Sequence, residues 1–285
     1  MSATTKGKTD IDKLETIAAK VRKHIIRMIT EAGSGHPGGS LSCTDMIVAL
    51  YFGKLRYNPT QPDWPDRDRF VLSKGHGCPA WYATLAEAGY FDVNELETLR
   101  RFGSKLQGHP ERGRLPGIEV SSGSLGQGLS VGVGMSLAGR LDEKDYRVYV
   151  MVGCGEIQEG QIWEAAMSAS HYKLDNLCAI LDNNGFQIGG EIDNIMSTKP
   201  IPEKWQAFGW HVIEIDGHNM KQILDAYNQA EKIKGKPTMI IANTIKGKGV
   251  PFMERVADWH GKAPSEEQAQ SALADLSYRE SDESQ

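Results

Sequence analysis

The sequence predicts an α/β fold, a doubly wound parallel sheet with helices on both faces. From residue 146 onward, short runs rich in branched apolar residues alternate with segments of helical periodicity, which is typical of parallel sheets with crossover helices. A glycine turn follows the first of these runs, at the sheet edge where such folds bind ligands. With 285 residues, 40% of them hydrophobic, the chain can bury a sizeable core.

The N-terminal half predicts helices joined by glycine-rich loops. Apolar residues recur at three- and four-residue steps over 10–31 and Gly33 follows, so we expect an amphipathic helix that ends there. The other elements expected in this half are a loop at 33–40, a helix at 44–53, a loop at 58–69, a strand at 69–73, helices at 79–88 and 93–102, and a loop at 103–124.

Residues 124–139 predict a helix although the segment carries five glycines. Each glycine costs about 1 kcal/mol of helix propensity relative to alanine. We therefore expect this helix to pack its backbone closely against another element or a ligand.

The C-terminal half has a cleaner pattern. We expect strands at 146–152, 176–181, 210–215 and 238–242, and helices at 156–171 and 220–233. The sequence shows no repeat and no linker, which favours one domain over residues 1–264. Residues 265–285 are polar, and we expect them to form a fraying C-terminal tail.

Composition and charge exclude several classes of function. The net charge of −5 and the pI near 5.9 argue against nucleic acid or an anionic membrane as the main partner. The four cysteines show no C-x-x-C spacing, so free thiols in a reducing cytosol are the simplest interpretation. Residues 1–9 carry no apolar stretch of a signal peptide, and no apolar run is long enough to span a bilayer. We expect a cytoplasmic protein.

A ligand-binding turn is predicted at Gly153-Cys154-Gly155-Glu156. Glycines allow a tight turn that brings N–H groups against a phosphate, and the helix that follows adds its N-terminal dipole. Asn184, thirty residues after Cys154, and the carbonyl of Phe186 offer oxygens to a cation. The alternative is an ordinary strand, turn and helix followed by an asparagine-rich turn.

Four histidines lie beside glycine or proline in loops: His36, His76, His109 and His260. A single loop histidine is usually only solvated. Four of eight in such settings favour proton transfer or recognition of sugar hydroxyls, because imidazole donates and accepts near neutral pH. They lack the close spacing of a zinc site, which makes that interpretation weaker.

Two further segments stay open between a functional and an ordinary role. Glu159, on the first turns of the predicted helix, is either functional or an exposed carboxylate stabilised by the helix dipole. The run Lys246-Gly247-Lys248-Gly249 predicts either a phosphate-binding loop or a charged surface turn.

Together, these segments resemble transketolase, specifically its N-terminal, diphosphate-binding half. The matches cover nearly the whole chain and keep one order: Ser34-Gly35-His36-Pro37-Gly38, residues 66–77, Gly108-His109-Pro110-Glu111, residues 115–119, Gly123-Ser124-Leu125-Gly126-Gln127-Gly128, the turn at Cys154 with Asn184, Lys246-Gly247-Lys248-Gly249, and Trp259-His260-Gly261.

The resemblance implies thiamine diphosphate and Mg²⁺, or another divalent cation, as cofactors. It implies cofactor contacts at His76, Ser124, Leu125, Gly126, Gly153, Gly155, Glu156, Asn184 and His260. It implies a cation held by Asn184, the Phe186 carbonyl and the residue at Cys154. The implied catalytic residues are His36, His109 and His260, which would face sugar hydroxyls, and Glu159, which would belong to an acidic path between paired sites.

The resemblance also implies a partner. Transketolase continues into a pyrimidine-binding and a C-terminal domain, which this sequence lacks, so we expect a second subunit that carries both, with two copies of each chain. The complex would transfer a two-carbon ketol unit to an aldose from a ketose, which we expect to be phosphorylated in the family's manner.

Cys154 departs from the family pattern, which has an aspartate ligand there. A thiol is a poor ligand for Mg²⁺, and a thiolate favours softer metals such as zinc. Three outcomes stay open: weaker magnesium binding, another metal, or a subunit whose activity is weakened or lost. Other thiamine enzymes, such as a deoxyxylulose phosphate synthase or a 2-oxo acid dehydrogenase subunit, are alternatives. A non-catalytic subunit is a third.

Overall fold

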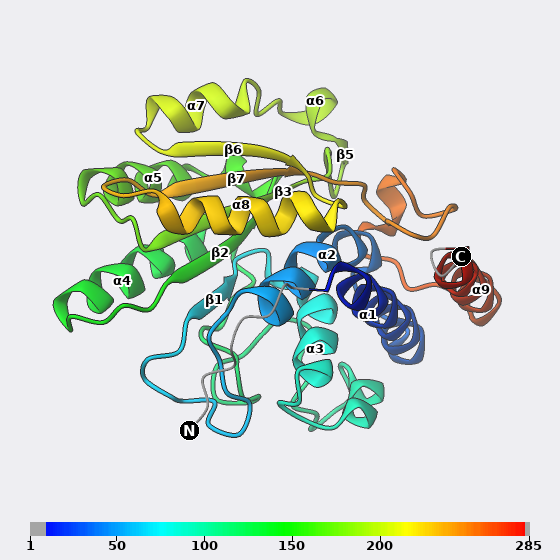
Figure 1. Cartoon of the computed structure of the whole chain (residues 1–285). Helices are drawn as coiled ribbons and strands as arrows, with labels where there is room; N and C mark the ends of the chain where they lie inside the picture. Colours follow the sequence, from blue (N-terminus) through cyan, green and yellow to red (C-terminus); the bar gives the residue numbers. More distant parts are fainter. Residues whose placement is uncertain (1–9, 283–285) are drawn as a thin grey trace.

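The computed structural model describes residues 10–282, so the expectation that residues 1–9 hold no signal peptide lies outside the described chain. Figure 1 shows the arrangement of its helices and strands. The helices are α1 Ile11–Ala32, α2 Pro37–Gly53, α3 Cys78–Glu87, α4 Gln127–Leu141, α5 Gly160–His171, α6 Ile192–Ile195, α7 Ile201–Ala207, α8 Met220–Lys232 and α9 Glu266–Asp282. The strands are β1 Arg69–Leu72, β2 Val148–Gly153, β3 Leu177–Asn183, β4 Phe186–Gln187, β5 Gly190–Glu191, β6 His211–Asp216 and β7 Thr238–Asn243.

Five of these strands form one parallel sheet in the order β1-β2-β3-β7-β6, and β4 and β5 form a separate short hairpin. This confirms the predicted α/β class. The chain leaves β3 for β6 through α7 and returns from β6 to β7 through α8, so β3 and β7 are neighbours whose connections run in opposite directions. Such a reversal opens a crevice at the carboxyl ends of the strands.

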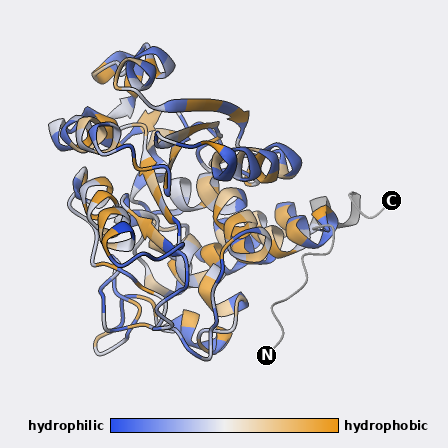
Figure 2. Cartoon of the chain, turned by 60° about the vertical axis from the view of Figure 1, so that its left-hand side comes forward, coloured by the Kyte–Doolittle hydropathy of each residue, from blue (hydrophilic) through white to orange (hydrophobic). Residues whose placement is uncertain are grey.

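The two faces of the sheet bury separate hydrophobic cores, because successive strand residues point to opposite faces. On β3, Leu177, Ala179 and Leu181 join one core, and Cys178 and Ile180 join the other. Helices α4, α5 and α7 contribute to the first core, and α1, α2, α3, α8 and α9 to the second. Figure 2 shows the hydrophobic residues concentrated in these interior segments.

The expected elements of the N-terminal half need two corrections. Helix α2 begins at Pro37, although residues 37–40 were expected in a loop. Proline suits the first helical position, and the small residues that follow allow close packing: a Cβ on Gly38 would lie 2.8 Å from the Trp259 carbonyl oxygen. The helix expected at 93–102 is a short 3₁₀ segment, Val93–Thr98.

The expectation of a fraying tail after residue 264 is wrong for the described part of that segment. Helix α9 lies beside α1 (Figure 1), and Ala269, Ala272 and Leu276 are buried in the shared core. These residues recur at three- and four-residue steps, which orients one face of a mostly polar helix toward α1. The segments between β3 and β6, which include α6, α7 and the hairpin, were not expected. None of the described helices has the length and apolar character of a bilayer-spanning segment.

The glycine-rich helix α4 packs as expected. A Cβ on Gly132 would clash with Val150 Cγ2 in the sheet, whereas a Cβ on Gly134 would meet nothing within 4 Å. We expect Gly132→Ala to lower the free energy of unfolding by about 1–3 kcal/mol through overpacking. Gly134→Ala, the matched control, should raise it by about 0.5–1 kcal/mol. Urea unfolding of both variants checks this, and equal effects would contradict the close packing.

Candidate active site

Four histidines from separate loops converge beyond the carboxyl ends of the strands. The ring centroids of His36 and His76 lie 5.3 Å apart, those of His76 and His260 5.1 Å, and those of His36 and His260 5.6 Å. His109 stands at the rim, with its centroid 6.4 Å from that of His36. The structure therefore brings together all four histidines that the sequence singles out.

These imidazoles are neutral at physiological pH. Burial, followed by the charge of Lys74, lowers the pKa of His76 to about 2. Burial lowers the pKa of both His36 and His260 to about 4, with Arg100 and Lys246 as the next contributors. Partial burial and Arg100 also lower the pKa of His109. A neutral imidazole has one N–H donor and one acceptor nitrogen, which suits hydrogen bonds with hydroxyl groups.

Lys246 brings a buried positive charge to this cluster. Its side chain is 1% exposed, and its Nζ lies 3.3 Å from His260 Nδ1 and 5.6 Å from the centroid of the Phe186 ring. It forms no ion pair with a described carboxylate. Burial lowers the pKa of Lys246 to about 8. A buried ammonium without a counter-ion is costly, and an anionic ligand would remove that cost.

A second buried lysine, Lys74, is neutralised within the protein. Its Nζ lies 2.6 Å from Asp182 Oδ2 and donates to the Gly39 carbonyl at 2.8 Å. Burial alone would lower the pKa of Lys74, but the Asp182 carboxylate outweighs burial and raises it. Asp182 is 0% exposed and also accepts from the hydroxyls of Ser42 and Thr244. This network joins α2, β1, β3 and the segment after β7 beneath the site.

The three expected cation ligands also meet. Cys154 Sγ lies 3.6 Å from Asn184 Oδ1 and 3.8 Å from the Phe186 carbonyl oxygen. Burial raises the pKa of the Cys154 thiol, and the charge of Asp182 adds to that effect. Within the part of the chain that the structure describes, no group of three His, Cys, Asp or Glu side chains is placed to hold a metal ion. The candidate cation site therefore consists of one sulfur and two neutral oxygens.

Glu156 lies behind the glycine loops, not at their surface. It is 2% exposed, and its carboxylate accepts from the N–H groups of Gly126 and Gly153, at 2.9 and 3.0 Å, and from the Ser73 hydroxyl. Burial raises the pKa of Glu156. The expected direct contact with a cofactor is not what this geometry offers, because both carboxylate oxygens already accept hydrogen bonds. Glu156 instead fixes the two glycine loops relative to each other.

The loop at Ser124, Leu125 and Gly126 borders the site. Gly126 has φ of 86° and a Cβ there would lie 2.9 Å from Glu159 Cβ, so this position favours glycine. Ser124 is exposed and Leu125 is partly buried. Glu159 is exposed at the start of α5 and makes no side-chain capping bond. Its expected role in an acidic path between paired sites stays a prediction. Gly155 lies at the turn before Glu156, and a Cβ there would lie 3.1 Å from Gln187 Cβ.

Arg100 is a site residue that sequence reasoning missed. It donates to Ser34 Oγ at 2.8 Å, and its Nη2 lies 3.4 Å from His36 Nδ1. Arg100 has φ of 59°, in the left-handed region, within a segment expected to be helical. No motif marks it, because its role depends on a turn that local periodicity did not predict.

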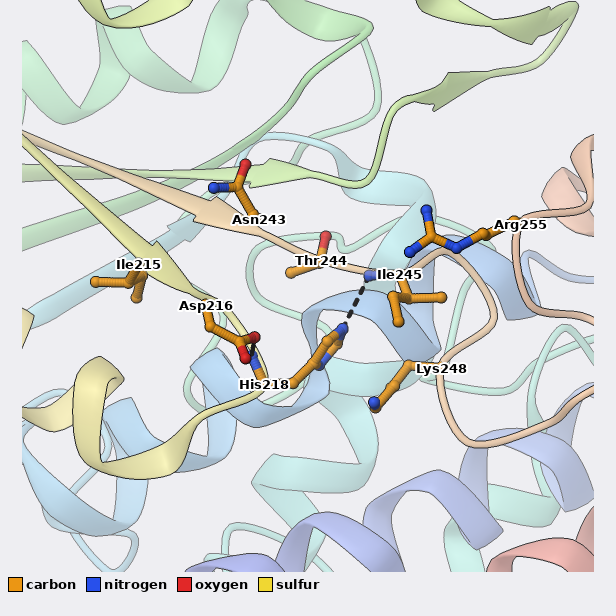
Figure 3. Close-up of a pocket in the computed structure, with 8 residues that line it drawn as sticks. All are labelled: Ile215, Asp216, His218, Asn243, Thr244, Ile245, Lys248 and Arg255. Carbon is orange, nitrogen blue, oxygen red and sulfur yellow. Dashed lines mark hydrogen bonds between the residues drawn. The ribbon is translucent and has the colours of Figure 1, made fainter.

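His218 fixes the loop that carries Lys246. Its Nε2 accepts from the Ile245 N–H at 2.8 Å, and its Nδ1 lies 2.7 Å from Asp45 Oδ2, which Arg22 also binds. The outer side of this loop lines a cavity of about 350 Å³ (Figure 3). Lys248 lines that cavity, whereas Lys246 points to His260 on the other side. The two lysines of the Lys246-Gly247-Lys248-Gly249 run therefore serve different surfaces.

The comparison with protein families decides the assignment of this site. Residues 14–283 match the family described as "Transketolase, thiamine diphosphate binding domain". The chain belongs to the transketolase family. Two relatives of transketolase type match almost end to end. One of the two subunits of an apulose-4-phosphate transketolase from Phocaeicola vulgatus is 45% identical over 94% of this chain and 95% of the relative. The 6-deoxy-6-sulfo-D-fructose transketolase subunit SqwG from Clostridium sp. is 48% identical over 92% and 96%.

Solved transketolase structures share the fold. The transketolase from Campylobacter jejuni matches with a TM-score of 0.88 and 33% identity over 93% of this chain, and that from Leishmania mexicana with 0.85 and 32% over 95%. The chain covers only 42% and 45% of those two structures. It therefore corresponds to less than half of these longer transketolases, while matching the subunits of the relatives above over nearly their whole length.

Proposed function

We propose that this chain binds the diphosphate end of thiamine diphosphate in a transketolase completed by a second subunit. The complex transfers a two-carbon ketol unit from a phosphorylated ketose to an aldose. The observation that carries this proposal is the buried Lys246 ammonium, which lacks a counter-ion in the described chain and faces the histidine cluster. A diphosphate supplies the missing negative charge.

The residues present fit that cofactor. Lys246, His76 and His260 would hold the diphosphate, together with backbone N–H groups at the Gly153 and Gly155 turn. Asn184, the Phe186 carbonyl and Cys154 would hold the divalent cation. Ser124, Leu125 and Gly126 would border the thiazolium ring. When bound, thiamine diphosphate supplies the carbon nucleophile, and the protein supplies orientation and electrostatics.

The histidines are suited to the sugar. His36, His109 and His260 would bind substrate hydroxyl groups, donating through one ring nitrogen and accepting through the other. Their lowered pKa values keep them neutral, so each can take or return a hydroxyl proton without first losing one to water. Arg100, next to His36, would add positive charge on the substrate side.

An anionic sugar is the substrate class that the relatives favour. One is named for apulose-4-phosphate and the other for a sulfonated fructose, and both names describe sugars with an anionic group. The family match favours transketolase over a deoxyxylulose phosphate synthase or a 2-oxo acid dehydrogenase subunit.

A partner subunit would cover the open side of the site. Ile188, Ile195 and Met196 follow the candidate cation site in sequence, and they are 79%, 49% and 63% exposed. Large apolar side chains exposed together in this way mark interaction surfaces. We infer a second subunit with the pyrimidine-binding and C-terminal domains, two copies of each chain, and a cytoplasmic location.

Calorimetric titration of thiamine diphosphate with a divalent cation tests the proposal, using this chain alone and co-purified with the second subunit. We expect tight binding and ketol transfer only in the complex. Absence of cofactor binding in the complex would favour a non-catalytic subunit. Activity with pyruvate but not with ketoses would point to a different thiamine enzyme.

A further inference from the structure

Cys154 sits where two oxygen donors converge. It directly follows β2 and is 2% exposed, and its backbone N–H donates to the Asp182 carbonyl at 3.2 Å. Its Sγ faces Asn184 Oδ1 at 3.6 Å and the Phe186 carbonyl oxygen at 3.8 Å. In this arrangement, the thiol proton lies between one sulfur and two oxygens that come from a different loop.

The orientation of the Asn184 amide is fixed from behind. Its Nδ2 lies 3.1 Å from Asp182 Oδ2 and 3.2 Å from Ser42 Oγ, and an ionised carboxylate can only accept. The amide oxygen must therefore point to Cys154, and it also accepts from the Phe186 N–H at 3.1 Å. Partners of this kind, which orient a ligand without touching the ion, are a regular feature of metal sites.

The spacing of these atoms matches a tetrahedral thiolate–oxygen site. Zinc binds sulfur at about 2.3 Å and oxygen at about 2.0–2.2 Å, which places the two ligand atoms about 3.5–3.7 Å apart at a tetrahedral angle. The distances of 3.6 and 3.8 Å agree with that edge length. In the octahedral oxygen shell of Mg²⁺, neighbouring oxygens lie only about 3 Å apart.

We propose that Cys154, Asn184 and the Phe186 carbonyl form a metal site that selects borderline ions such as Zn²⁺ or Co²⁺ over Mg²⁺. The ion replaces the thiol proton: a metal–sulfur bond forms, the S–H bond breaks, and the proton passes to water. A thiolate is a soft ligand that favours these ions, whereas Mg²⁺ favours carboxylate, carbonyl and water. The proposal rests on the proposed function only for the diphosphate oxygens that would complete the coordination.

Cobalt spectroscopy tests the site without relying on activity. The full chain is titrated with Co²⁺ alone, and then with thiamine diphosphate and the second subunit, while the thiolate-to-cobalt charge-transfer absorption is followed. We expect this absorption in the natural chain and its loss in Cys154→Ser. Zn²⁺ should displace Co²⁺ near stoichiometry, and Mg²⁺ should fail to do so even at about 100-fold excess.

Two variants make the test specific. Cys178→Ala removes another buried thiol, on β3, and should leave the absorption unchanged. Cys154→Asp restores an oxygen ligand and should shift the preference toward Mg²⁺ by about 10-fold or more. Thermal unfolding of Cys154→Ser shows whether the variant is folded, and Cys154→Asp gives an independent readout if it is not.

The outcomes separate this proposal from the proposed function. Absence of the absorption in the natural chain, its persistence in Cys154→Ser, or equal competition by Mg²⁺ would overturn the metal preference. If thiamine diphosphate binds with Mg²⁺ in that case, the proposed function still holds. If the absorption is present but no ion supports cofactor binding in the complex, the metal site stands and the proposed function fails.

Discussion

Asp182→Ala is expected to lower the free energy of unfolding by about 3–5 kcal/mol, because it leaves the buried Lys74 ammonium without its partner. Lys74 and Asp182 are joined at 2.6 Å, with side chains 3% and 0% exposed. The hydroxyls of Ser42 and Thr244 would also lose their acceptor. Urea unfolding of the cofactor-free chain measures the effect.

The chain offers a matched control in Asp225→Ala. The Lys221–Asp225 pair on α8 has the same 2.6 Å separation, but its side chains are 72% and 61% exposed. Exposed pairs of this kind contribute no more than about 0.5 kcal/mol. Adding Lys74→Met to Asp182→Ala should recover part of the loss, because the unpaired charge is removed. Equal losses in Asp182→Ala and Asp225→Ala would contradict a structural role for the buried pair.

Lys246→Met is expected to weaken thiamine diphosphate binding by about 10- to 100-fold, the loss of a charge-assisted contact of about 1.5–3 kcal/mol. The same change should raise the free energy of unfolding of the cofactor-free chain, because a buried charge without a counter-ion disappears. Calorimetry and urea unfolding measure the two effects. Lys248→Met, in the same loop but facing the cavity of Figure 3, should change the affinity by no more than about 2-fold.

The pH dependence of binding gives a second readout for Lys246. With a pKa of about 8 in the free chain, Lys246 is charged below pH 8, and a bound diphosphate raises that pKa. Above pH 8, binding must therefore take up a proton, and the affinity of the natural chain should fall by up to about 10-fold per pH unit. Proton release from Cys154 on metal binding acts in the opposite direction, so the difference between the natural chain and Lys246→Met isolates Lys246. Equal slopes in the two proteins would exclude Lys246 from the diphosphate site.

Local patterns in the sequence predicted the elements whose residues follow one period. The strands of the parallel sheet and helix α4 are examples, and the close approach of Gly132 to Val150 is the packing that its glycines required. The start of α2 was missed because Gly38 and Gly39 resemble a loop. Glycine is needed at residue 38 only because Trp259 and Lys246, more than two hundred residues later, pack against it.

The site shows the same division between local and distant causes. The sequence identified the four histidines and the grouping of Cys154, Asn184 and Phe186, because motif spacing carries that information. It did not identify Arg100, whose position depends on a left-handed turn, or the position of Glu156 behind the loops, which depends on hydrogen bonds to Gly126 and Gly153. For α9, the spacing of Ala269, Ala272 and Leu276 was a usable signal that the polar composition obscured.

The alternation along β3 has a consequence for how reliably the site assembles. Cys178, Ile180 and Asp182 share one face of this strand, and Leu177, Ala179 and Leu181 share the other. A pairing error of one residue would exchange the two sets, so it would expose Asp182 to the wrong core and misplace both layers of hydrophobic side chains. A chain that has packed its sheet correctly has therefore also aimed the carboxylate that orients Asn184. Misregistered molecules would be removed by their poor stability before they could present a defective site.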